Sequence, residues 1–470
     1  MSEAGNENLG TPSNPLRVAV IGSGPAGFYI VSNFMKYPDL TVEIDMFDRL
    51  PTPFGLVRGG VAPDHQKDKS VTRAYDKSAK QPNYRFFGNV EFGKHVTLDD
   101  LKHYYHQIVF STGAQVDRTL GVRGEEFTGS HSATDFVAWY NGHPDFAHLK
   151  FELSSESVAI VGIGNVAVDV ARMLCRTHDE LRQTDMADYA IEALRDSNVK
   201  NIYMLGRRGP AQAAFTPPEI KELAELVGAD VVIAQEEARL DAESRRDIEA
   251  GADKNVLKNV EIIEEISGRG QCSKDKRLTI RFLVSPTEIL GDENGNVTGI
   301  RIVKNELVRK DDGTLSARST GEEETIPVGM VFRSVGYRGV ALPGIPFNER
   351  WGNIFNDKGR VTTEEGDPVR GLYCAGWIKR GPSGVIGTNK TDAQETVACM
   401  VEDLKAGRYL HAAHTRPDEA MAFVASRQPA AVSYDDWTAI DAEELRMGTE
   451  DNRPRVKFTR VEDMLDVLDR

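Results

Sequence analysis

A glycine-rich segment near the start of the chain has the spacing that can hold a pyrophosphate group. Gly22, Gly24 and Gly27 form the pattern G-x-G-x-x-G, between an apolar run at 17–21 and an apolar helical pattern that starts at Phe28. In this pattern the first glycine permits a tight turn from strand to helix. The second lets the main chain approach the phosphates, and the third lets the helix pack closely on the strand. Negative charge is favoured at such a helix start, so we expect a dinucleotide site.

An acidic residue follows at the position where it can bind ribose hydroxyls. The next apolar run, 41–47, reads as a second strand and ends in Asp48, about 20 residues after the last glycine. This arrangement makes a simple glycine turn in an unrelated α/β protein the weaker interpretation. It favours a dinucleotide with a free 2′-hydroxyl.

The glycine pattern recurs in the middle of the chain with a different ending. Gly162, Gly164 and Ala167 follow a strand pattern at 157–161, and the next strand, 201–205, ends in Arg207 and Arg208. Arginine accommodates a 2′-phosphate through forked, charge-assisted hydrogen bonds. The alternative is that these two arginines are ordinary solvated surface residues that bind no ligand. We therefore predict FAD at the first site and NADPH at the second, with hydride transfer from nicotinamide to flavin as their joint purpose.

Composition excludes several other classes of protein. A chain of 470 residues with net charge −15 has no globally basic surface for nucleic acid, and its length favours two or three domains. No stretch approaches the roughly 18 apolar residues needed to cross a bilayer. Residues 1–15 are polar and lack the features of a targeting segment. They are expected to form a disordered leader, and the protein is expected to be cytoplasmic.

The four cysteines argue against metal and dithiol chemistry. No two of Cys175, Cys272, Cys374 and Cys399 fall in a C-x-x-C spacing. A redox-active disulfide, an iron–sulfur cluster and a structural zinc site are therefore not expected. Independent reduced thiols are the interpretation that remains.

Beyond these motifs, the sequence resembles adrenodoxin reductase and the bacterial ferredoxin–NADP reductases of the same type. The resemblance extends through nearly the whole chain in the right order. It rests on the blocks at 20–29, 53–65, 206–210 with 213–216, 335–339 and 376–389. Several of these blocks are far more specific than a glycine pattern.

The resemblance implies which residues bind the two cofactors. For FAD it points, besides the glycines, to Ala26, Asp48, Leu56, Phe92, Trp377, Gly384, Val385 and Ile386. For NADP it points to Arg118, Asn165, Val166, Ala167, Arg207, Arg208, Glu219 and the main chain of Gly384. Trp377 could instead be a core aromatic. Glu219, in the first turn of an expected helix, could simply stabilise that helix.

The resemblance also implies a polar pair near flavin and nicotinamide, His65 and Glu222. Hydride transfer requires no proton from the protein, so we expect these residues to tune the flavin electrostatically or to relay protons. A hydrogen-bonded structural histidine is the alternative for His65. No metal site is expected.

The expected fold is α/β, with two Rossmann-like dinucleotide-binding domains in a glutathione-reductase-like architecture. An FAD-binding domain would comprise 16–114 and 334–470, and the NADP-binding domain, 115–333, would be inserted into it. We expect a helical insert at 179–195, strands near 277–304 with a turn at 291–296, a strand ending in a turn at 108–114, a helix at 391–400 and a helical tail at 462–468.

The acceptor implied by the resemblance is an acidic iron–sulfur protein of the ferredoxin type, with flavodoxin as a variant. An acidic reductase would need a local basic patch to dock such a partner. The candidates are Arg245, Arg246, Lys254 and Lys258, and a second pair, Lys379 and Arg380. Two other functions remain as alternatives. A disulfide-reductase-like or quinone- or dye-reducing flavoenzyme is the first, and a non-catalytic binding protein with an FAD-type fold is the second.

Overall fold

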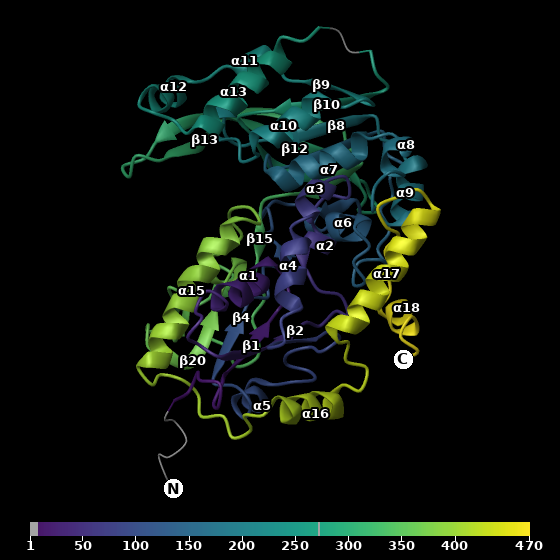
Figure 1. Cartoon of the computed structure of the whole chain (residues 1–470). Coiled ribbons are helices and arrows are strands. Elements are labelled where there is room, and N and C mark those ends of the chain that lie inside the picture. The colour runs from purple at the N-terminus through teal and green to yellow at the C-terminus, as the bar shows by residue number, and fades with distance from the viewer. Residues whose placement is uncertain (1–7, 271–272) are drawn as a thin grey trace. The chain divides into compact units, whose positions relative to one another are not determined.

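The computed structural model describes residues 8–270 and 273–470, which form two compact units. Unit 1 contains 1–116 and 337–470, and unit 2 contains 117–336 (Figure 1). The chain therefore crosses between the units twice. Near the crossings the Gln115 N–H donates to the Arg338 carbonyl oxygen at 3.1 Å, and the Arg118 N–H donates to that of Gly336 at 2.9 Å. None of the helices in the described ranges is long and apolar enough to cross a membrane.

Unit 1 is built on a seven-stranded sheet. Its order is β18 (Asn356–Asp357), β19 (Arg360–Thr362), β20 (Pro368–Cys374), β4 (Gln107–Phe110), β1 (Leu16–Ile21), β2 (Val42–Phe47) and β3 (Tyr84–Phe87). The strands from β20 to β3 pair in parallel, while β18 and β19 add antiparallel strands at one edge. The segment 108–114, predicted as a strand ending in a turn, is in strand conformation as far as Phe110.

Both faces of this sheet are buried, as expected for parallel strands. Along β1 the side chains alternate. Val18 and Val20 pack in one apolar cluster with α1 (Pro25–Phe34) and α15 (Thr388–Lys405), and Ala19 and Ile21 pack in another. The other helices of unit 1 are α2 (Leu56–Gly59), α3 (Gln66–Lys69), α4 (Thr72–Ala79), α5 (Leu98–Lys102), α14 (Trp377–Arg380), α16 (Pro417–Arg427), α17 (Tyr434–Glu450) and α18 (Val461–Asp466). Its small strands are β16 (Phe347–Asn348) and β17 (Asn353–Ile354), with β15 (Tyr337–Arg338) pairing β5 (Val116–Asp117) at the crossing.

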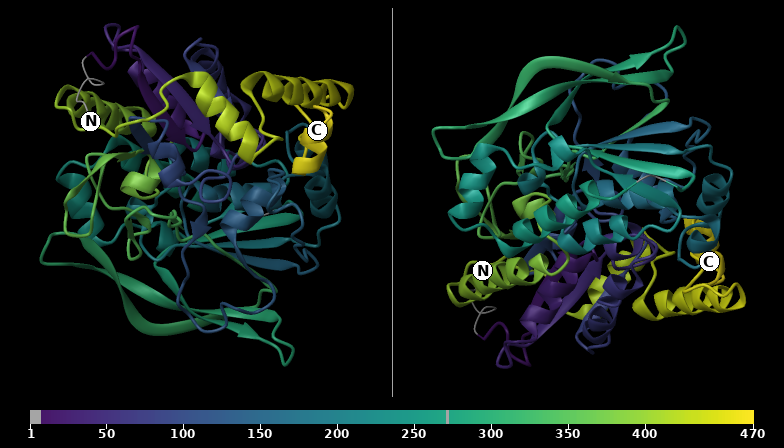
Figure 2. Two further views of the ribbon diagram at one scale, coloured as in Figure 1. Left: turned by 90° about the horizontal axis from the view of Figure 1, so that it is seen from below. Right: turned by 90° about the horizontal axis from the view of Figure 1, so that it is seen from above.

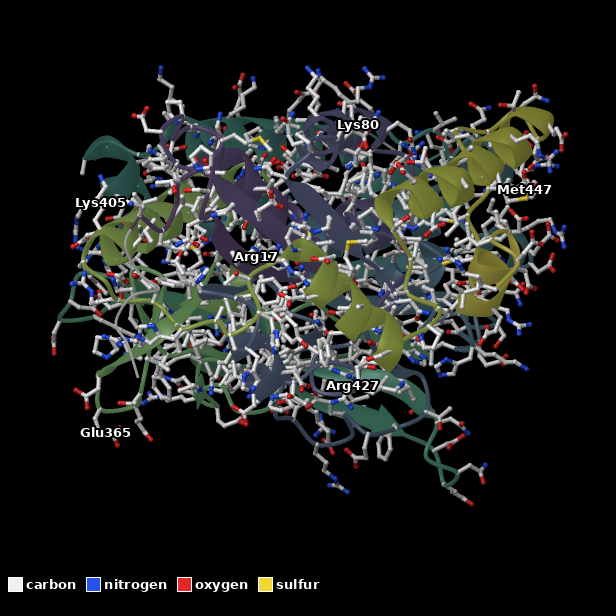
Figure 3. The ribbon with its side chains drawn as sticks, turned by 60° about the horizontal axis from the view of Figure 1, so that its bottom comes forward. Arg17, Lys80, Glu365, Lys405, Arg427 and Met447 are labelled. Carbon is white, nitrogen blue, oxygen red and sulfur yellow. The ribbon has the colours of Figure 1, made fainter. Side chains whose placement is uncertain are left out.

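A group of charged residues is buried within the same sheet. Arg17 on β1 contacts Asp45 on β2 at 2.8 Å, and both side chains are fully buried. The Tyr105 hydroxyl and the Arg85 guanidinium also donate to Asp45, at 2.7 and 2.6 Å. Figure 3 shows Arg17 within the unit, whereas Lys80 extends from its outside. Because a buried carboxylate needs such partners, this group fixes the alignment of β1 and β2, the two strands that precede the predicted FAD contacts.

Unit 2 is built on six parallel strands. Their order is β6 (Ser130–Ser132), β14 (Met330–Arg333), β7 (Ser157–Val161), β8 (Asn201–Leu205), β10 (Lys276–Arg281) and β9 (Ala229–Val232). Its helices are α6 (Ala133–Tyr140), α7 (Asn165–Cys175), α8 (His178–Leu181), α9 (Asp188–Arg195), α10 (Pro217–Ala224), α11 (Gln235–Ala238), α12 (Ala242–Glu249) and α13 (Lys254–Ser267), with a 3₁₀ turn at Pro210–Gln212.

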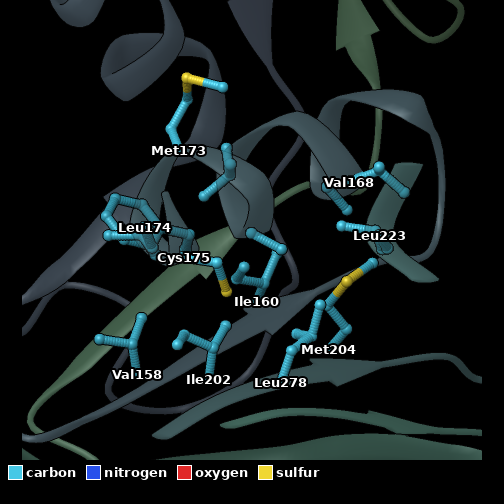
Figure 4. Close-up of a cluster of buried hydrophobic side chains, with 14 of the residues drawn as sticks. Val158, Ile160, Val168, Met173, Leu174, Cys175, Ile202, Met204, Leu223 and Leu278 are labelled. Atoms are coloured by element: carbon cyan, nitrogen blue, oxygen red, sulfur yellow. The ribbon is translucent and has the colours of Figure 1, made fainter. Parts of the chain in front are cut away.

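Helices cover one face of this sheet and a second sheet covers the other. On the helical face Val158 and Ile160 of β7 meet α7 and α10 (Figure 4). On the other face Ala159 and Val161 meet an antiparallel sheet of β11 (Val284–Gly291), β12 (Val297–Arg309) and β13 (Leu315–Ile326). In Figure 2 these long strands form the curved green ribbon of the unit. The layers place the end of β8, with the predicted 2′-phosphate contacts, beside both sheets.

The α/β fold class with two parallel sheets is thus as predicted, and most predicted elements are present. The insert at 179–195 forms two helices, α8 and α9, and the helix predicted at 391–400 is the longer α15. The turn at 291–296 connects β11 and β12, and the helical tail is α18.

The leader needs a correction. Residues 1–7 lie outside the described part, but 8–15 are not disordered. Their main chain forms a turn in which Thr11 pairs with Asn14, and the Thr41 N–H bonds the Gly10 oxygen. Leu9 also packs on the core.

Candidate functional site

The first glycine turn connects β1 to α1 in the form that a pyrophosphate requires. Gly22 has φ +104°, and a Cβ there would lie 2.7 Å from the Ser111 carbonyl oxygen. A Cβ at Gly27 would collide with the carbonyl oxygen of Gly22. An added Cβ at Gly24, by contrast, would meet nothing within 4 Å, and no side chain caps α1. Free N–H groups at a helix start, beside open space at Gly24, fit an anionic pyrophosphate.

Asp48 follows β2 as predicted, and its carboxylate binds the glycine turn. It accepts hydrogen bonds from the Ser23 N–H at 2.9 Å, from the Ser23 hydroxyl at 2.5 Å and from the Leu50 N–H at 3.0 Å. A carboxylate offers about four acceptor positions, so room remains for one hydroxyl. Asp48 thus holds the turn in shape, and its contact to a ribose stays a prediction.

A strained loop lies directly on the same turn. Phe54 has φ +85°, rare for a residue with a bulky side chain, and its N–H donates to the Ser23 carbonyl oxygen at 2.9 Å. A Cβ at Gly55 would lie 2.9 Å from the Gly24 Cα, and Leu56 follows with 38% of its side chain exposed. The strain at Phe54 was not foreseen from the sequence, because no residue-type signal marks it. It brings Leu56 to the glycine turn, where the resemblance expects an FAD contact.

The C-terminal part of unit 1 returns to the start of α1. Gly376 follows β20 with φ +78°, and a Cβ there would lie 2.6 Å from the Ala26 Cβ. Trp377 comes next. Its ring centroid is 5.5 Å from that of Tyr337, and its indole N–H donates to the Ser383 carbonyl oxygen at 3.2 Å. The structure therefore brings Trp377 and Ala26 to the same end of the sheet, although they are about 350 residues apart.

Helix α15 begins beside this segment without a side-chain cap. Its N-cap is Gly387, and the preceding Gly384 has φ +78°, with its Cβ position against Thr388. Val385 is 55% exposed, whereas Ile386 packs on the core. An uncapped start of an 18-residue helix favours negative charge, which suits the carbonyl edge of a reduced flavin.

Two further predicted site residues of unit 1 are Phe92, which has aromatic neighbours, and His65, which has acidic ones. Phe92 packs its ring on Phe110 with centroids 5.4 Å apart, which places it among core aromatics. His65 is the N-cap of α3 and has a largely buried side chain, 3.8 Å from the Asp68 carboxylate and 4.0 Å from that of Asp64. Two acidic side chains therefore lie near the imidazole, and the role of His65 beside the flavin remains a prediction.

The second glycine turn, in unit 2, repeats the geometry between β7 and α7. Gly162 has φ +130°, and a Cβ there would collide with the Ser334 carbonyl oxygen. Gly164 is the N-cap of α7, and no side chain caps this helix. Arg118 lies beside Gly336, with its Cδ 3.8 Å from the Cβ position there, two residues after the Ser334 that contacts Gly162.

The residues after the second turn have structural contacts of their own. The side-chain oxygen of Asn165 accepts the Thr216 N–H at 2.9 Å. Ala167 is fully buried between helix and sheet, and Val166 packs on the same core. These contacts leave the main-chain N–H groups of the first turn as the part of α7 that fits a phosphate.

Arg207 and Arg208 follow β8 as predicted, and they form an unneutralised cationic pair. Within the described residues neither side chain makes an ion pair, although most arginines of the chain do. Burial, and then the charge of Arg207, lower the pKa of Arg208. Two adjacent guanidinium groups without an acid fit a dianionic phosphate, so the donor set matches the predicted 2′-phosphate.

Glu219 and Glu222 pair with a buried arginine of unit 2. Both lie on α10 and face the fully buried Arg172 of α7, at 3.3 and 3.4 Å. Asp169 completes the group at 2.8 Å from Arg172. Arg172 was not among the predicted residues, although an arginine between the apolar Ala171 and Met173 can indicate a buried cation. Arg172 thus fixes the carboxylates of Glu219 and Glu222, whose roles toward NADP and catalysis remain predictions.

One predicted docking pair is wrong. Lys379 is buried, with its ammonium 3.2 Å from Asp392 and 2.8 Å from Glu395. Arg380 donates to Asn389 at 3.1 Å and lies 3.5 Å from Asp392. Their positive charge is neutralised inside unit 1, so this pair offers no basic patch.

The four cations of the other predicted docking group are exposed, but two of them already form ion pairs with acids of the chain. Arg246 and Lys258 pair with Glu243 and Glu261, each on its own helix. Arg245 and Lys254 are exposed and form no ion pair within the described part of the chain. Arg245 and Lys254 are therefore the members that remain candidates.

The described cysteines lack the arrangement that a disulfide reductase needs. Cys175, Cys374 and Cys399 are all buried free thiols, and Cys272 lies outside the described residues. Burial raises the pKa of all three described thiols, which disfavours the reactive thiolate.

Comparison with known proteins gives consistent matches. Residues 16–205 match the family model described as pyridine nucleotide-disulphide oxidoreductase. The chain is 42% identical to the NADPH-ferredoxin reductase FprA of Mycobacterium tuberculosis, over 96% of this chain and 98% of the relative. It is 37% identical to the mitochondrial NADPH:adrenodoxin oxidoreductase of Arabidopsis thaliana, over 96% and 95%. The structure of M. tuberculosis FprA in complex with NADPH superposes with a TM-score of 0.90 at 41% identity, covering 97% of this chain and 99% of that one.

Proposed function

Since the chain belongs to the adrenodoxin-reductase-type family of NADPH–ferredoxin reductases, we propose that it passes electrons from NADPH through FAD to a ferredoxin. The chain is an oxidoreductase with two dinucleotide sites. Unit 1 binds FAD and unit 2 binds NADPH. When bound, FAD supplies the chemistry of taking up a two-electron hydride and releasing electrons singly, which suits a one-electron acceptor.

The observation that carries the proposal is the contrast between the two glycine turns. In unit 1 the turn is followed by Asp48, whose carboxylate suits a free hydroxyl. In unit 2 it is followed by Arg207 and Arg208, which lack acidic partners within the described residues and suit a phosphate. A protein that only recognised partners would gain nothing from this pair, which speaks against the non-catalytic alternative.

The residues of unit 1 hold and shape the flavin site. The glycine turn and α1 bind the pyrophosphate, and the loop at Phe54 brings Leu56 over it. Trp377 would lie against bound FAD, and the uncapped start of α15 would stabilise negative charge on it. The side chain of His65 takes up or releases a proton as the flavin changes its redox state.

The residues of unit 2 bind and select the coenzyme. The second glycine turn binds the pyrophosphate, and Arg118 contributes from beside it. Glu219 and Glu222, held by the buried Arg172, present fixed carboxylates on α10. We assign Glu222 a role in orienting the coenzyme for hydride transfer, rather than in proton transfer.

The acceptor in this proposal is an acidic ferredoxin that docks through Arg245 and Lys254. The two cations are exposed and carry no ion pair in the part that the structure describes, so they are available to a partner. Because the chain has a net charge of −15, their attraction for an acidic partner acts only at short range. The free buried thiols support the cytoplasm as the compartment.

The proposal is tested by steady-state reduction of cytochrome c with NADPH, in the presence and absence of a ferredoxin. The purified protein should be yellow, and cytochrome c reduction should depend on the ferredoxin. The same preparation should reduce a small dye without ferredoxin. Equal cytochrome c reduction with and without ferredoxin would contradict the acceptor, and a colourless preparation that takes up no FAD would contradict the enzyme class.

A further inference from the structure

Three consecutive carbonyl groups hold the arginine pair against the antiparallel sheet of unit 2. The Gly206 oxygen accepts the Val284 N–H at 2.9 Å, and the Arg208 oxygen accepts the Leu283 N–H at 3.1 Å. The Arg207 oxygen, between them, accepts a side-chain N–H of Asn305 at 2.9 Å. Asn305 is thus the one side chain in a set of bonds that otherwise involves only main chain.

The amide of Asn305 is itself held in place. It is 8% exposed, and the same nitrogen, Nδ2, donates to the Ser285 hydroxyl at 2.7 Å. Its main-chain N–H donates to the carbonyl oxygen of Leu283 at 2.7 Å, and Leu283 has φ +55°. A register shift between Val303 and Asn305 interrupts the pairing of β12 with β13 at this point. Such irregularities re-aim side chains, here toward the end of β8.

We infer that Asn305 is a positioning residue for coenzyme selection, which holds the main chain of Arg207 so that the arginine pair can bind the 2′-phosphate of NADPH. This inference rests on the proposed function. The Nδ2 group carries two N–H donors, and Asn305 uses one for a carbonyl and one for a hydroxyl. Leucine has a similar size but donates nothing, so it would leave the Arg207 oxygen without its partner.

The fixed main chain matters because it determines where the two guanidinium groups lie before the coenzyme arrives. A pre-organised site loses less free energy on binding than one that must be ordered. A displacement of about 1 Å can cost about 10²-fold in rate. Because the bonds to Gly206 and Arg208 remain in the variant, we expect a smaller effect, about tenfold, for Asn305→Leu.

The experiment compares adenosine 2′,5′-bisphosphate with ADP as calorimetric probes of the holoenzyme, together with steady-state kinetics of dye reduction by NADPH and by NADH. In Asn305→Leu the Kd for adenosine 2′,5′-bisphosphate should rise about tenfold while that for ADP stays unchanged. The KM for NADPH should rise with little change in kcat. A merely structural role would weaken both probes equally or lower only the thermal midpoint.

A matched control is Asn141→Leu, since Asn141 is also a buried asparagine of unit 2 whose amide donates to a main-chain oxygen, that of Val137, at 3.1 Å. It should leave the ratio of the two affinities unchanged. Ser285→Ala provides a second variant in case Asn305→Leu fails to fold. It removes only the acceptor that orients the amide, and it should shift the same ratio in the same direction.

The outcomes separate this inference from the proposal on which it rests. A lost preference for the 2′-phosphate in both the arginine variants and Asn305→Leu supports both. A lost preference in the arginine variants alone, with folded Asn305→Leu and Ser285→Ala unaffected, would overturn the role of Asn305. An unaffected preference in the arginine variants would overturn the proposal that Arg207 and Arg208 bind the 2′-phosphate.

Discussion

Neutralising Arg207 and Arg208 together should convert an NADPH-selective protein into one that barely distinguishes NADPH from NADH. A hydrogen bond to a charged group contributes about 1.5–3 kcal/mol. Arg207 is exposed, so we assign it the lower value, and the half-buried Arg208, shielded from water, the upper one. Their sum is about 4.5 kcal/mol, which corresponds to about 10³-fold in kcat/KM.

The assay measures kcat/KM for NADPH and for NADH with a small-dye acceptor, in the wild type and in the Arg207→Gln/Arg208→Gln variant. The value for NADPH should fall about 10³-fold, and the value for NADH should change by less than about threefold, because NADH has no 2′-phosphate to lose. The loss should appear mainly in KM. Added salt should weaken NADPH binding in the wild type more than in the variant.

A parallel fall for both coenzymes would refute the reasoning, since it would show that the arginines support the fold of unit 2 rather than the phosphate. An unchanged preference would show that another group reads the 2′-phosphate. The two single variants measure the separate contributions of Arg207 and Arg208 to NADPH binding. Arg208→Gln should cost more than Arg207→Gln, because the charge of Arg208 is the less hydrated of the two.

Three further predictions concern the flavin turn, the core of unit 1 and the docking surface. Gly27→Ala should abolish most FAD binding, measured by flavin fluorescence after denaturation, because its Cβ would collide with a main-chain oxygen of the turn. Glu444→Gln should cost about 3 kcal/mol of unfolding free energy in urea, because it breaks a buried ion pair. The wild type should also lose stability in acid, as described below. Arg245→Gln/Lys254→Gln should raise the KM for ferredoxin severalfold at low salt, with dye reduction unchanged.

The acid sensitivity of Glu444 follows from the direction of its pKa. Burial alone would raise it, but Arg58 and Arg455 outweigh burial and hold the pKa of Glu444 below its ordinary value. A lowered pKa in the folded state adds stability above the unfolded pKa, and this stability is lost as pH falls through the folded pKa. The urea midpoint of the wild type should therefore fall in acid by more than that of Glu444→Gln. Identical pH profiles would contradict this assignment.

The docking variant has a matched control on unit 1. Lys77 and Lys80 are exposed, and neither forms an ion pair within the described residues. Replacing both by glutamine removes the same charge as Arg245→Gln/Lys254→Gln. If the control raises the KM for ferredoxin equally, net charge rather than a specific surface governs docking.

Much of the fold could be predicted because local patterns determine it. The glycine spacing at Gly22 and at Gly162 is specific to a strand, a tight turn and a helix, so it predicts these units. Both glycines have the positive φ that such a turn needs. The long-range return of Gly376 to Ala26 could be expected only through the family resemblance. No local pattern connects positions that are so far apart in the sequence.

The parts that escaped prediction depend on tertiary partners. Lys379 looks like surface in the sequence, but Asp392 and Glu395 of α15 neutralise it inside unit 1. Arg172 of α7 forms ion pairs with Glu219 and Glu222 of α10. Asn305 donates a hydrogen bond to the carbonyl oxygen of Arg207, which lies 98 positions earlier in the sequence. A residue's type shows that it can carry charge or donate a hydrogen bond. Which partner it meets is decided by packing.

The central claim, that electrons pass from NADPH through a bound flavin to a ferredoxin, is tested most directly by anaerobic stopped-flow absorbance. The holoenzyme is mixed first with NADPH and then with oxidised ferredoxin. We predict rapid bleaching of the flavin band by NADPH, much slower bleaching by NADH, and recovery of the band in step with reduction of the ferredoxin. A flavin band that NADPH does not bleach, or that bleaches but does not recover with any ferredoxin, would contradict this account.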